Sequence, residues 1–314
     1  MTLIPRTSLD VHPLNLGGNT FGWTSDRDTS FAVLDAFVAA GGNFIDTADL
    51  YAVWMDGSDG GDSERVIGEW LTTSGHRRDE VVIATKVGGL PTRKGLSLDN
   101  ADRALDESLA RLQTDHVDLY YAHYDDEQMS IPEQVAAGQA LVESGRVRHL
   151  ALSNHSPERM REFFEVATRE GASVPVAIQP HYNLLHRSQY EQSYRAIAAD
   201  FDVAVFPYFA LASGLLSGKY RAPADLEGRD REQMAGRYLN EHTFGVVDVL
   251  VQVAEQHQVE PATVALAWLL AKGVTAPIAS ARTVDQLPAL LAAPGLVLSA
   301  DDVARLDQAS APFA

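Results

Sequence analysis

Short apolar segments alternate with amphipathic segments along almost the whole chain, and this alternation limits the fold more than any other feature of the sequence. Apolar runs of four to eight residues are typical of buried strands, whereas spacings such as Leu105, Leu109 and Leu112 indicate a helix. Strands and helices in strict alternation predict an α/β fold, a (β/α)8 TIM barrel formed by a single domain over residues 1–314. No G-x-G-x-x-G follows the first strand, which argues against a doubly wound dinucleotide-binding sheet.

The expected elements follow from these patterns and from the turn residues between them. Strands are predicted at 14–19, within 43–51, and at 81–85, 117–122, 147–152, 176–178, 203–206 and 275–279. Helices are predicted at 31–40, 63–71, 98–112, 132–143, 157–168, 190–199, 246–256, 261–270 and 284–291, with a long polar connection at 213–241.

The composition excludes several classes of function. The chain has 25 Lys and Arg against 43 Asp and Glu, a formal net charge of −18, which opposes binding to nucleic acid or to an anionic membrane. It has no cysteine, which excludes disulfides, thiolate metal ligands and a cysteine nucleophile. The first residues lack the apolar core of a signal peptide and no run of about 18 apolar residues occurs, so a cytoplasmic location is expected.

Three of the predicted strands end at an ionisable side chain. These side chains are Asp46, Lys86 and His123, and Tyr51 follows five residues after the aspartate. Because the carboxyl ends of the strands form the active-site face of a barrel, we expect these groups to converge there. Any one of them suits an ordinary turn equally well, but a turn does not need an acid, a lysine and a histidine together.

The types of these residues point to proton transfer. An unperturbed tyrosine has a pKa of about 10, and a lysine buried beside Tyr51 is expected to lower that pKa, while Asp46 keeps the ammonium group charged. Tyr51 would then exchange a proton with a carbonyl or alcohol oxygen, with its hydroxyl in hydrogen-bond reach of Lys86 and His123. None of these groups supplies a hydride, so a redox reaction requires a cofactor. The spacer between acid and phenol, including Asp49, is expected to be a loop.

The sequence resembles the aldo-keto reductase superfamily over almost its whole length. The resemblance lies in seven ordered segments, which are 43–48 with Tyr51, Lys86, 118–120 with His123, 152–154, Gln179 with 182–184, 214–220, and 277–278 with Arg282. It implies a catalytic tetrad of Asp46, Tyr51, Lys86 and His123. It also implies a nicotinamide cofactor that extends across the barrel mouth.

The same resemblance implies the contacts of that cofactor. Ser153, Asn154 and Gln179 would hold the nicotinamide carboxamide, and Tyr208 would stack on the ring. The pyrophosphate and adenosine contacts that it implies are Phe209, Leu211, Ser213, Gly214, Ser217, Lys219, Ser280, Arg282 and Gln286. Arg282 suits a 2′-phosphate, which favours NADPH, with NADH as the alternative.

Other residues have less specific patterns. Gly18 and Asn19 are placed near the nicotinamide ribose, although a glycine pair is also an ordinary turn. The chain departs from the common family pattern at 209–210, 279–280 and 289–290, the last of which replaces an acid and asparagine pair that grips adenine. Residues expected to line a substrate pocket, with ordinary packing as the alternative for the tryptophans, are Trp23, Trp54 and Tyr124. His181 and His186 are expected to be structural, with no metal site, and 125–127 to be a solvated acidic loop.

These features favour an NADPH-dependent oxidoreductase that reversibly reduces an aldehyde or ketone to an alcohol, with Tyr51 as general acid or base. The expected partner is a small carbonyl or alcohol, and nothing in the sequence specifies the oligomeric state. One alternative is a barrel lyase that forms a Schiff base on Lys86, although an ion-paired lysine is a poor nucleophile. The other is a regulatory subunit that binds the cofactor as a redox signal without significant turnover.

Overall fold

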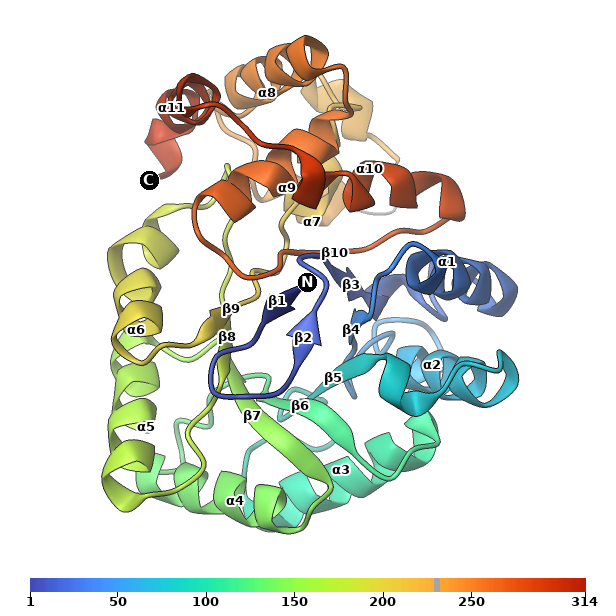
Figure 1. The fold of residues 1–314 in the computed structure, drawn as a ribbon, viewed down its shortest axis with the longest axis vertical. Helices are drawn as coiled ribbons and strands as arrows, with labels where there is room; N and C mark the ends of the chain where they lie inside the picture. Colours follow the sequence, from blue (N-terminus) through green and yellow to red (C-terminus); the bar gives the residue numbers. More distant parts are fainter. Residues whose placement is uncertain (229–231) are drawn as a thin grey trace.

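Eight parallel strands form a ring at the centre of the computed structural model, which describes residues 1–228 and 232–314 (Figure 1). The strands lie in the order β10-β3-β4-β5-β6-β7-β8-β9. They are β3 (Asn15–Gly17), β4 (Phe44–Asp46), β5 (Val82–Val87), β6 (Val117–Ala122), β7 (Val147–Ser153), β8 (Ala177–Gln179), β9 (Ala204–Val205) and β10 (Ile278–Ala279). The ring closes beside β9 and β10, where the Ile278 N–H donates to the Pro207 carbonyl over 2.9 Å. The predicted (β/α)8 barrel is confirmed.

Helices cover the outside of this ring (Figure 1). The main ones are α1 (Arg27–Ala39), α2 (Asp62–Thr73), α3 (Leu98–Leu112), α4 (Ile131–Glu143), α5 (Pro157–Glu170), α6 (Arg195–Asp200), α8 (Thr243–His257), α9 (Pro261–Ala271) and α10 (Leu287–Leu291). Local rules set their ends: the Ser97 hydroxyl accepts the Asn100 N–H at the start of α3. Gly171 ends α5 with a φ of 64°, a conformation that favours glycine.

Strand side chains alternate between two apolar cores. Ile83 belongs to the core between strands and helices, whereas its neighbour Ala84 belongs to the core inside the ring, together with Phe44. Because successive side chains of a strand point to opposite faces, residues two positions further along point inward as well. This period of two directs Asp46 and Lys86 toward the barrel axis.

Three parts of the chain have structure that the sequence patterns did not predict. A hairpin of β1 (Thr2–Leu3) and β2 (Asp10–Val11) places Ile4 and Val11 in the inner core, beside residues at the beginnings of the strands. Helix α11 (Ala300–Ala309) follows the last predicted helix. The connection predicted at 213–241 contains two 3-10 helices, Ala212–Ser217 and Pro223–Leu226, and α7 (Glu232–Gly236), while its residues 229–231 lie outside the described residues.

Some predicted elements have different limits in the structure. The first barrel strand ends at Gly17 and continues as a 3-10 turn, Gly18–Thr20. The predicted helix at 190–199 begins with one π-helical turn, Tyr190–Tyr194, before α6. The predicted helix at 284–291 is a 3-10 turn, Val284–Gln286, followed by α10. Propensity alone does not separate these tight and wide turns from an α-helix.

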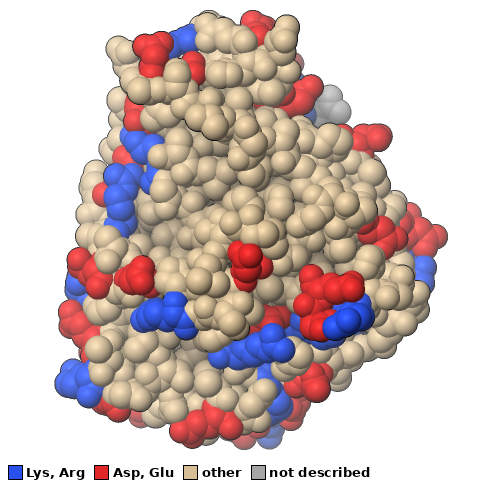
Figure 2. Space-filling model, in the orientation of Figure 1, with Lys and Arg blue, Asp and Glu red and all other residues tan. Residues whose placement is uncertain are grey.

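The face that carries the β1–β2 hairpin is largely uncharged, and acidic and basic side chains gather along its lower part (Figure 2). Within residues 1–228 and 232–314, no single helix is both long and apolar enough to cross a membrane. One pair of helical segments, 284–295 with 300–309, has the required length and composition only across a bend of 118°.

Candidate active site

Four ionisable side chains meet at the carboxyl ends of β4, β5 and β6. Asp46 is the last residue of β4, Lys86 lies one residue before the end of β5, and His123 follows β6 directly. Tyr51 enters from the loop after β4. Asp46 and Lys86 are fully buried, with exposed fractions of 1% and 0%. The structure thus brings together the four residues of the predicted tetrad.

The Lys86 ammonium group is the centre of this cluster. Its Nζ donates to the Asp46 carboxylate at 2.5 Å, to the Thr47 carbonyl at 2.7 Å and to the Tyr51 hydroxyl at 2.9 Å. The Tyr51 hydroxyl donates to the same Asp46 oxygen over 3.2 Å, and the Gln179 amide donates to the other over 2.9 Å. The three hydrogen bonds that Lys86 donates use all three of its ammonium hydrogens, so its nitrogen presents no lone pair to the barrel mouth.

His123 lies beside the ring of Tyr51. The two ring centroids are 6.3 Å apart in an edge arrangement, and Tyr124 stacks on the imidazole at 4.8 Å. The Nδ1 atom of His123 is buried and has no hydrogen-bond partner among the described residues. The main-chain carbonyl of His123 accepts a hydrogen bond from the Asn154 side-chain amide over 2.8 Å. Of the two contacts expected for the Tyr51 hydroxyl, the structure therefore contains the one with Lys86 and, within the described residues, lacks the one with His123.

Burial controls the protonation of these groups. It raises the pKa of Tyr51 well above the ordinary value, and the Asp46 carboxylate adds to this effect. Burial lowers the pKa of Lys86, against the opposing charge of Asp46, and lowers the pKa of His123 well below the ordinary value. The expectation of a lowered phenol pKa is therefore wrong here, because burial and the Asp46 carboxylate both raise it. Tyr51 and His123 are both neutral near pH 7.

A hydrogen-bonded group of polar residues adjoins the tetrad at the ends of β7 and β8. The Ser153 hydroxyl donates to the Gln179 carbonyl over 2.9 Å, and the Asn154 amide donates to the Ser153 hydroxyl over 3.1 Å. The Tyr208 hydroxyl donates to the Asn154 side-chain oxygen over 2.9 Å. Through Gln179 and Asp46, this group of four predicted cofactor residues is joined directly to the tetrad.

The segment after Tyr208 has an unusual backbone. Phe209, Ala212 and Ser213 have positive φ angles of 52°, 47° and 57°, and Gly214 has a φ of 100°. Such conformations in residues other than glycine cost energy and concentrate at functional sites. Within the part of the chain that the structure describes, the buried Ser213 hydroxyl has no hydrogen-bond partner, which suits an anionic group such as a pyrophosphate. The same segment contains the predicted residues Leu211, Ser217 and Lys219.

The residues predicted for the adenosine end also lie together. The Ser280 hydroxyl donates to the Asn19 side-chain oxygen over 2.6 Å, and the Arg282 N–H donates to the Gln286 side-chain oxygen over 2.8 Å. The contact of Ser280 with Asn19 follows from the pairing of β10 with β3, the strand that precedes Asn19, whereas Arg282 and Gln286 are only four residues apart in the chain. A Cβ on Gly18 would lie only 2.8 Å from a neighbouring side chain, so close packing requires a glycine there.

Aromatic rings surround the exposed side of the tetrad. Trp54 packs edge-on against Trp23 at 5.3 Å and lies 6.4 Å from the Tyr51 ring. Trp54 and Tyr124 are 47% and 46% exposed, although both are large and apolar. Because Tyr124 also stacks on His123, an exposed aromatic ring stands next to the phenol and another next to the imidazole.

In the acidic stretch 125–127, Glu127 is exposed as predicted, but the prediction of a solvated cluster is wrong for Asp125. The Asp125 side chain is only 7% exposed and accepts hydrogen bonds from the Arg159 guanidinium and from the Gln134 amide, the latter at 2.9 Å. Asp126 accepts the Leu96 N–H over 3.0 Å. Asp125 finds its partners on α4 and α5, so sequence spacing gave no signal for them. The bonds anchor the loop that presents Tyr124.

The two histidines of the β8 loop pack beneath the Tyr208 ring. His181 stacks on His186 at 3.8 Å and on Tyr208 at 5.2 Å, and its Nε2 lies 2.7 Å from the Tyr238 hydroxyl. These contacts agree with a structural role for both histidines. Within the described part of the chain, no three His, Cys, Asp or Glu side chains form a group able to hold a metal ion.

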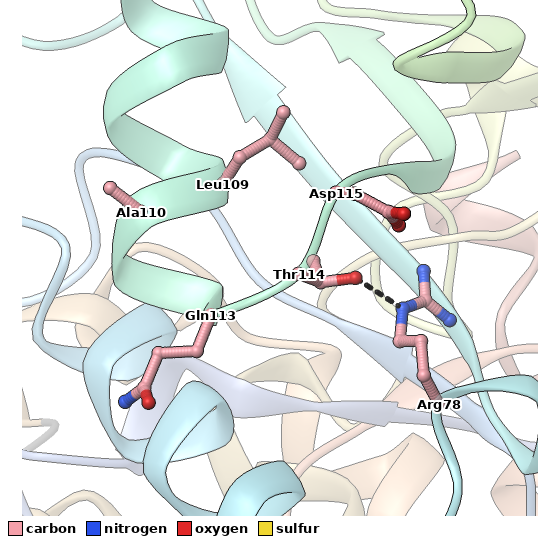
Figure 3. Close-up of a pocket in the computed structure, with 6 residues that line it drawn as sticks. All are labelled: Arg78, Leu109, Ala110, Gln113, Thr114 and Asp115. Atoms are coloured by element: carbon pink, nitrogen blue, oxygen red, sulfur yellow. Dashed lines mark hydrogen bonds between the residues drawn. The ribbon is translucent and has the colours of Figure 1, made fainter.

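A shallow surface hollow lies at the other end of the barrel (Figure 3). It is lined by Arg78, Leu109, Ala110, Gln113, Thr114 and Asp115. The Arg78 guanidinium donates to the Thr114 hydroxyl over 3.1 Å inside it. The hollow borders the loop before β6, whereas His123 follows β6, a separation of about 20 Å at 3.3 Å per residue. It contains no residue of the tetrad, so it does not mark the active site.

Comparison with known proteins identifies the family of the chain. The model of the Aldo/keto reductase family matches residues 13–311. "Uncharacterized oxidoreductase YrpG" of Bacillus subtilis is 35% identical over 91% of this chain and 88% of its own length. The chain is also 32% identical to "Norsolorinic acid reductase B" of Aspergillus parasiticus, over 98% of this chain and 83% of that protein. It is 32% identical to the rice protein "Probable voltage-gated potassium channel subunit beta", over 84% of this chain and 81% of that protein. The chain belongs to the aldo/keto reductase family, a family of oxidoreductases.

Proposed function

We propose that this protein is an NADPH-dependent reductase that converts an aldehyde or ketone to the alcohol, with Tyr51 as the proton donor. The observation that carries the proposal is the hydrogen-bonded chain from Asp46 through Lys86 to the Tyr51 hydroxyl. The phenol is neutral and accepts a bond from the ammonium group, so it donates its proton to a developing alkoxide when its O–H turns from Asp46 to the substrate. His123, held neutral by burial, orients the substrate oxygen as a hydrogen-bonding group.

Residues of this chain also suit the nicotinamide cofactor that the family generally uses. When bound, the cofactor supplies the hydride that no side chain carries. Ser153, Asn154 and Gln179, which adjoin the tetrad, would hold the carboxamide, and Tyr208 would support the ring. The Ser213 hydroxyl, which has no hydrogen-bond partner within the described residues, would bind a phosphate oxygen in the strained turn after β9. Arg282 at the adenosine end favours a 2′-phosphate, and therefore NADPH over NADH.

A second candidate is a regulatory subunit that binds the cofactor with little turnover, and the rice relative named as a potassium channel subunit favours it. The tetrad geometry weighs against this candidate, because a protein that only senses the cofactor does not need a phenol held by a buried ion pair. The Schiff-base alternative has weaker support, because all three hydrogens of the Lys86 ammonium group are donated to protein oxygens.

Two measurements test the proposal on the purified protein. Fluorescence titration with NADPH and NADH should give tighter binding of NADPH, and a panel of simple aldehydes and ketones should show steady NADPH consumption at 340 nm. Tight NADPH binding without consumption for any carbonyl compound would favour the regulatory candidate. Covalent trapping of a carbonyl substrate on Lys86 by borohydride would instead support the Schiff-base lyase.

A further inference from the structure

Asp49 is a buried acid beside the tetrad for which the proposed mechanism has no use. It lies three residues after Asp46 and two before Tyr51, and its exposed fraction is 1%. Among the described residues, neither carboxyl oxygen has a side-chain hydrogen-bond partner, and the Leu50 N–H of the same loop has the smallest effect on the pKa of Asp49. The prediction of a loop residue was correct, but the loop is buried. An ionised carboxylate in such a place is costly, so a neutral Asp49 is favoured.

Other charged groups surround this acid. Glu64 on α2 is fully buried, accepts the Thr85 hydroxyl at 2.5 Å and binds the Arg111 guanidinium of α3 at 2.7 Å. Arg93, in the loop after β5, has a buried guanidinium nitrogen without a hydrogen-bond partner. We name Asp49, Glu64, Arg93 and Arg111 the Asp49 cluster. The charges of Glu64 on α2, Arg93 in the loop after β5 and Arg111 on α3 shift the pKa of Asp49. The charge of Asp49 in turn shifts the pKa of Lys86 on β5 and of Tyr120 on β6.

Two contacts join the Asp49 cluster to the tetrad and to the substrate side. The Asp49 N–H donates to the Lys86 carbonyl over 3.3 Å. The loop that carries Trp54 returns over the cluster, where a Cβ on Gly60 would lie 2.6 Å from the Asp49 carbonyl. A Cβ on Gly61 would lie 2.3 Å from the Arg111 guanidinium. The glycines therefore allow the loop to rest directly on the cluster.

We propose that Asp49 is a positioning residue that acts through Lys86: when its carboxyl gains or loses a proton, the charge of the Asp49 cluster changes, and with it the field at the lysine beside Tyr51. The role rests on the proposed reductase function. Burial and the Glu64 carboxylate raise the pKa of Asp49 to about 7, against the charges of Arg111 and Arg93. Ionised Asp49 in turn raises the pKa of Lys86, so the lysine keeps its charge to higher pH.

The test is the pH profile of kcat and kcat/KM for NADPH-dependent reduction, measured from pH 5 to 10 for the wild type and Asp49→Asn. The wild type should show an inflection near pH 7 as well as an alkaline limb. Asp49→Asn should lose the inflection near pH 7 and move the alkaline limb to lower pH, and Asp49→Glu should restore the inflection. Loss of activity by one constant factor at every pH would overturn the proposal in favour of a purely structural role.

The matched control is Glu107→Gln. Glu107 binds Arg93 over 2.6 Å from the outside of the cluster and is 54% exposed, so its removal disturbs the same arginine without touching the buried acid. The inflection near pH 7 should remain in this variant. Its loss there as well would assign the inflection to the arginines and overturn the role of Asp49.

A measurement without turnover separates this inference from the proposed function. Because the folded-state pKa of Asp49 lies above its unfolded value, the folded protein binds the extra proton, and stability falls as pH rises from about 4 to about 7. Asp49→Asn should therefore raise Tm relative to the wild type more at pH 8 than at pH 5. Infrared titration of the wild type should also show a protonated carboxyl lost near pH 7. An equal Tm difference at both pH values, or no such carboxyl, contradicts the inference even if the enzyme is active.

Discussion

Two buried aspartates at opposite ends of the barrel have basic partners of different kinds. At the beginning of β6, the Asp118 carboxylate accepts the Arg78 guanidinium at 2.7 Å, the Ile83 N–H at 2.9 Å and the Arg148 guanidinium at 2.8 Å. At the end of β4, the Asp46 carboxylate binds the Lys86 ammonium group, which also donates a hydrogen bond to the Tyr51 hydroxyl. Asp118 and Asp46 are equally buried, each with an exposed fraction of 1%.

The ion pairs of Asp118 and Asp46 differ in the groups at their outer ends. The Asp118 pair ends in guanidinium groups that reach the surface, with exposed fractions of 19% for Arg78 and 47% for Arg148, so its charges only hold the strands together. The Asp46 pair ends in a phenol that faces an aromatic mouth, beside a histidine nitrogen with no partner. A buried ion pair is therefore weak evidence of function, whereas a pair that ends in a proton donor at the strand ends is strong evidence.

The largest expected effect is that of Tyr51→Phe, which removes the proposed proton donor and leaves the ring packing intact. The rate of NADPH-dependent reduction should fall by about 10²- to 10⁴-fold, the usual contribution of general acid catalysis. Tm should change little, because Lys86 keeps its bonds to Asp46 and Thr47. Full activity in a folded Tyr51→Phe variant would remove the contrast between the two ends of the barrel.

Asp118→Asn should have the opposite signature. It should lower the free energy of unfolding by about 2 kcal/mol, because two guanidinium groups lose a buried carboxylate that is their charged partner. Urea denaturation at pH 7 measures this loss. Turnover per folded molecule should stay near that of the wild type, and a strong loss of turnover with normal stability would show that the Asp118 end also takes part in the chemistry.

The histidines of the mouth should make the protein less stable in acid. Burial lowers the pKa of His123, and lowers the pKa of His181 to about 3. In the unfolded chain a histidine has a pKa of about 6.5, so below that pH it binds a proton that the buried histidine of the folded chain does not bind. The free energy of unfolding therefore decreases as pH falls, by up to about 1.4 kcal/mol per pH unit for each histidine. Denaturation curves at pH 7.5, 6 and 5 should show this slope, and His181→Gln should reduce it. An unchanged slope in that variant would place the cause elsewhere.

Trp54→Ala should give the smallest effect, a rise of about fivefold in KM for an aromatic carbonyl compound, because stacking of aromatic rings contributes about 1 kcal/mol. Stability should hardly change, since Trp54 is 47% exposed. Leu3→Ala is the matched control at the other end of the barrel, because Leu3 is 58% exposed on the β1–β2 hairpin. Equal KM values for Trp54→Ala and the wild type would mean that the substrate does not reach this ring.

Much of the fold and of the site was predictable because strand ends repeat along the chain. Asp46 and Lys86 each follow an apolar run, and the carboxyl ends of the strands form one face of a barrel, so both could be assigned to that face before any contact was known. The β1–β2 hairpin was missed because strands of two residues have no measurable period. The anchors of Asp125 were missed because Arg159 lies 34 residues further along the chain.

The sequence by itself determined the alternation of strands and helices, the order of the strands and the residues at their ends, because these depend on local periodicity and short turns. Only the tertiary structure decided the protonation of the site. The pKa of Tyr51 is raised rather than lowered, and the pKa of Asp49, a loop residue as predicted, is raised to about 7, because desolvation depends on how many elements pack around a group. That packing comes from segments far apart in the chain, and residue types and spacings do not encode it.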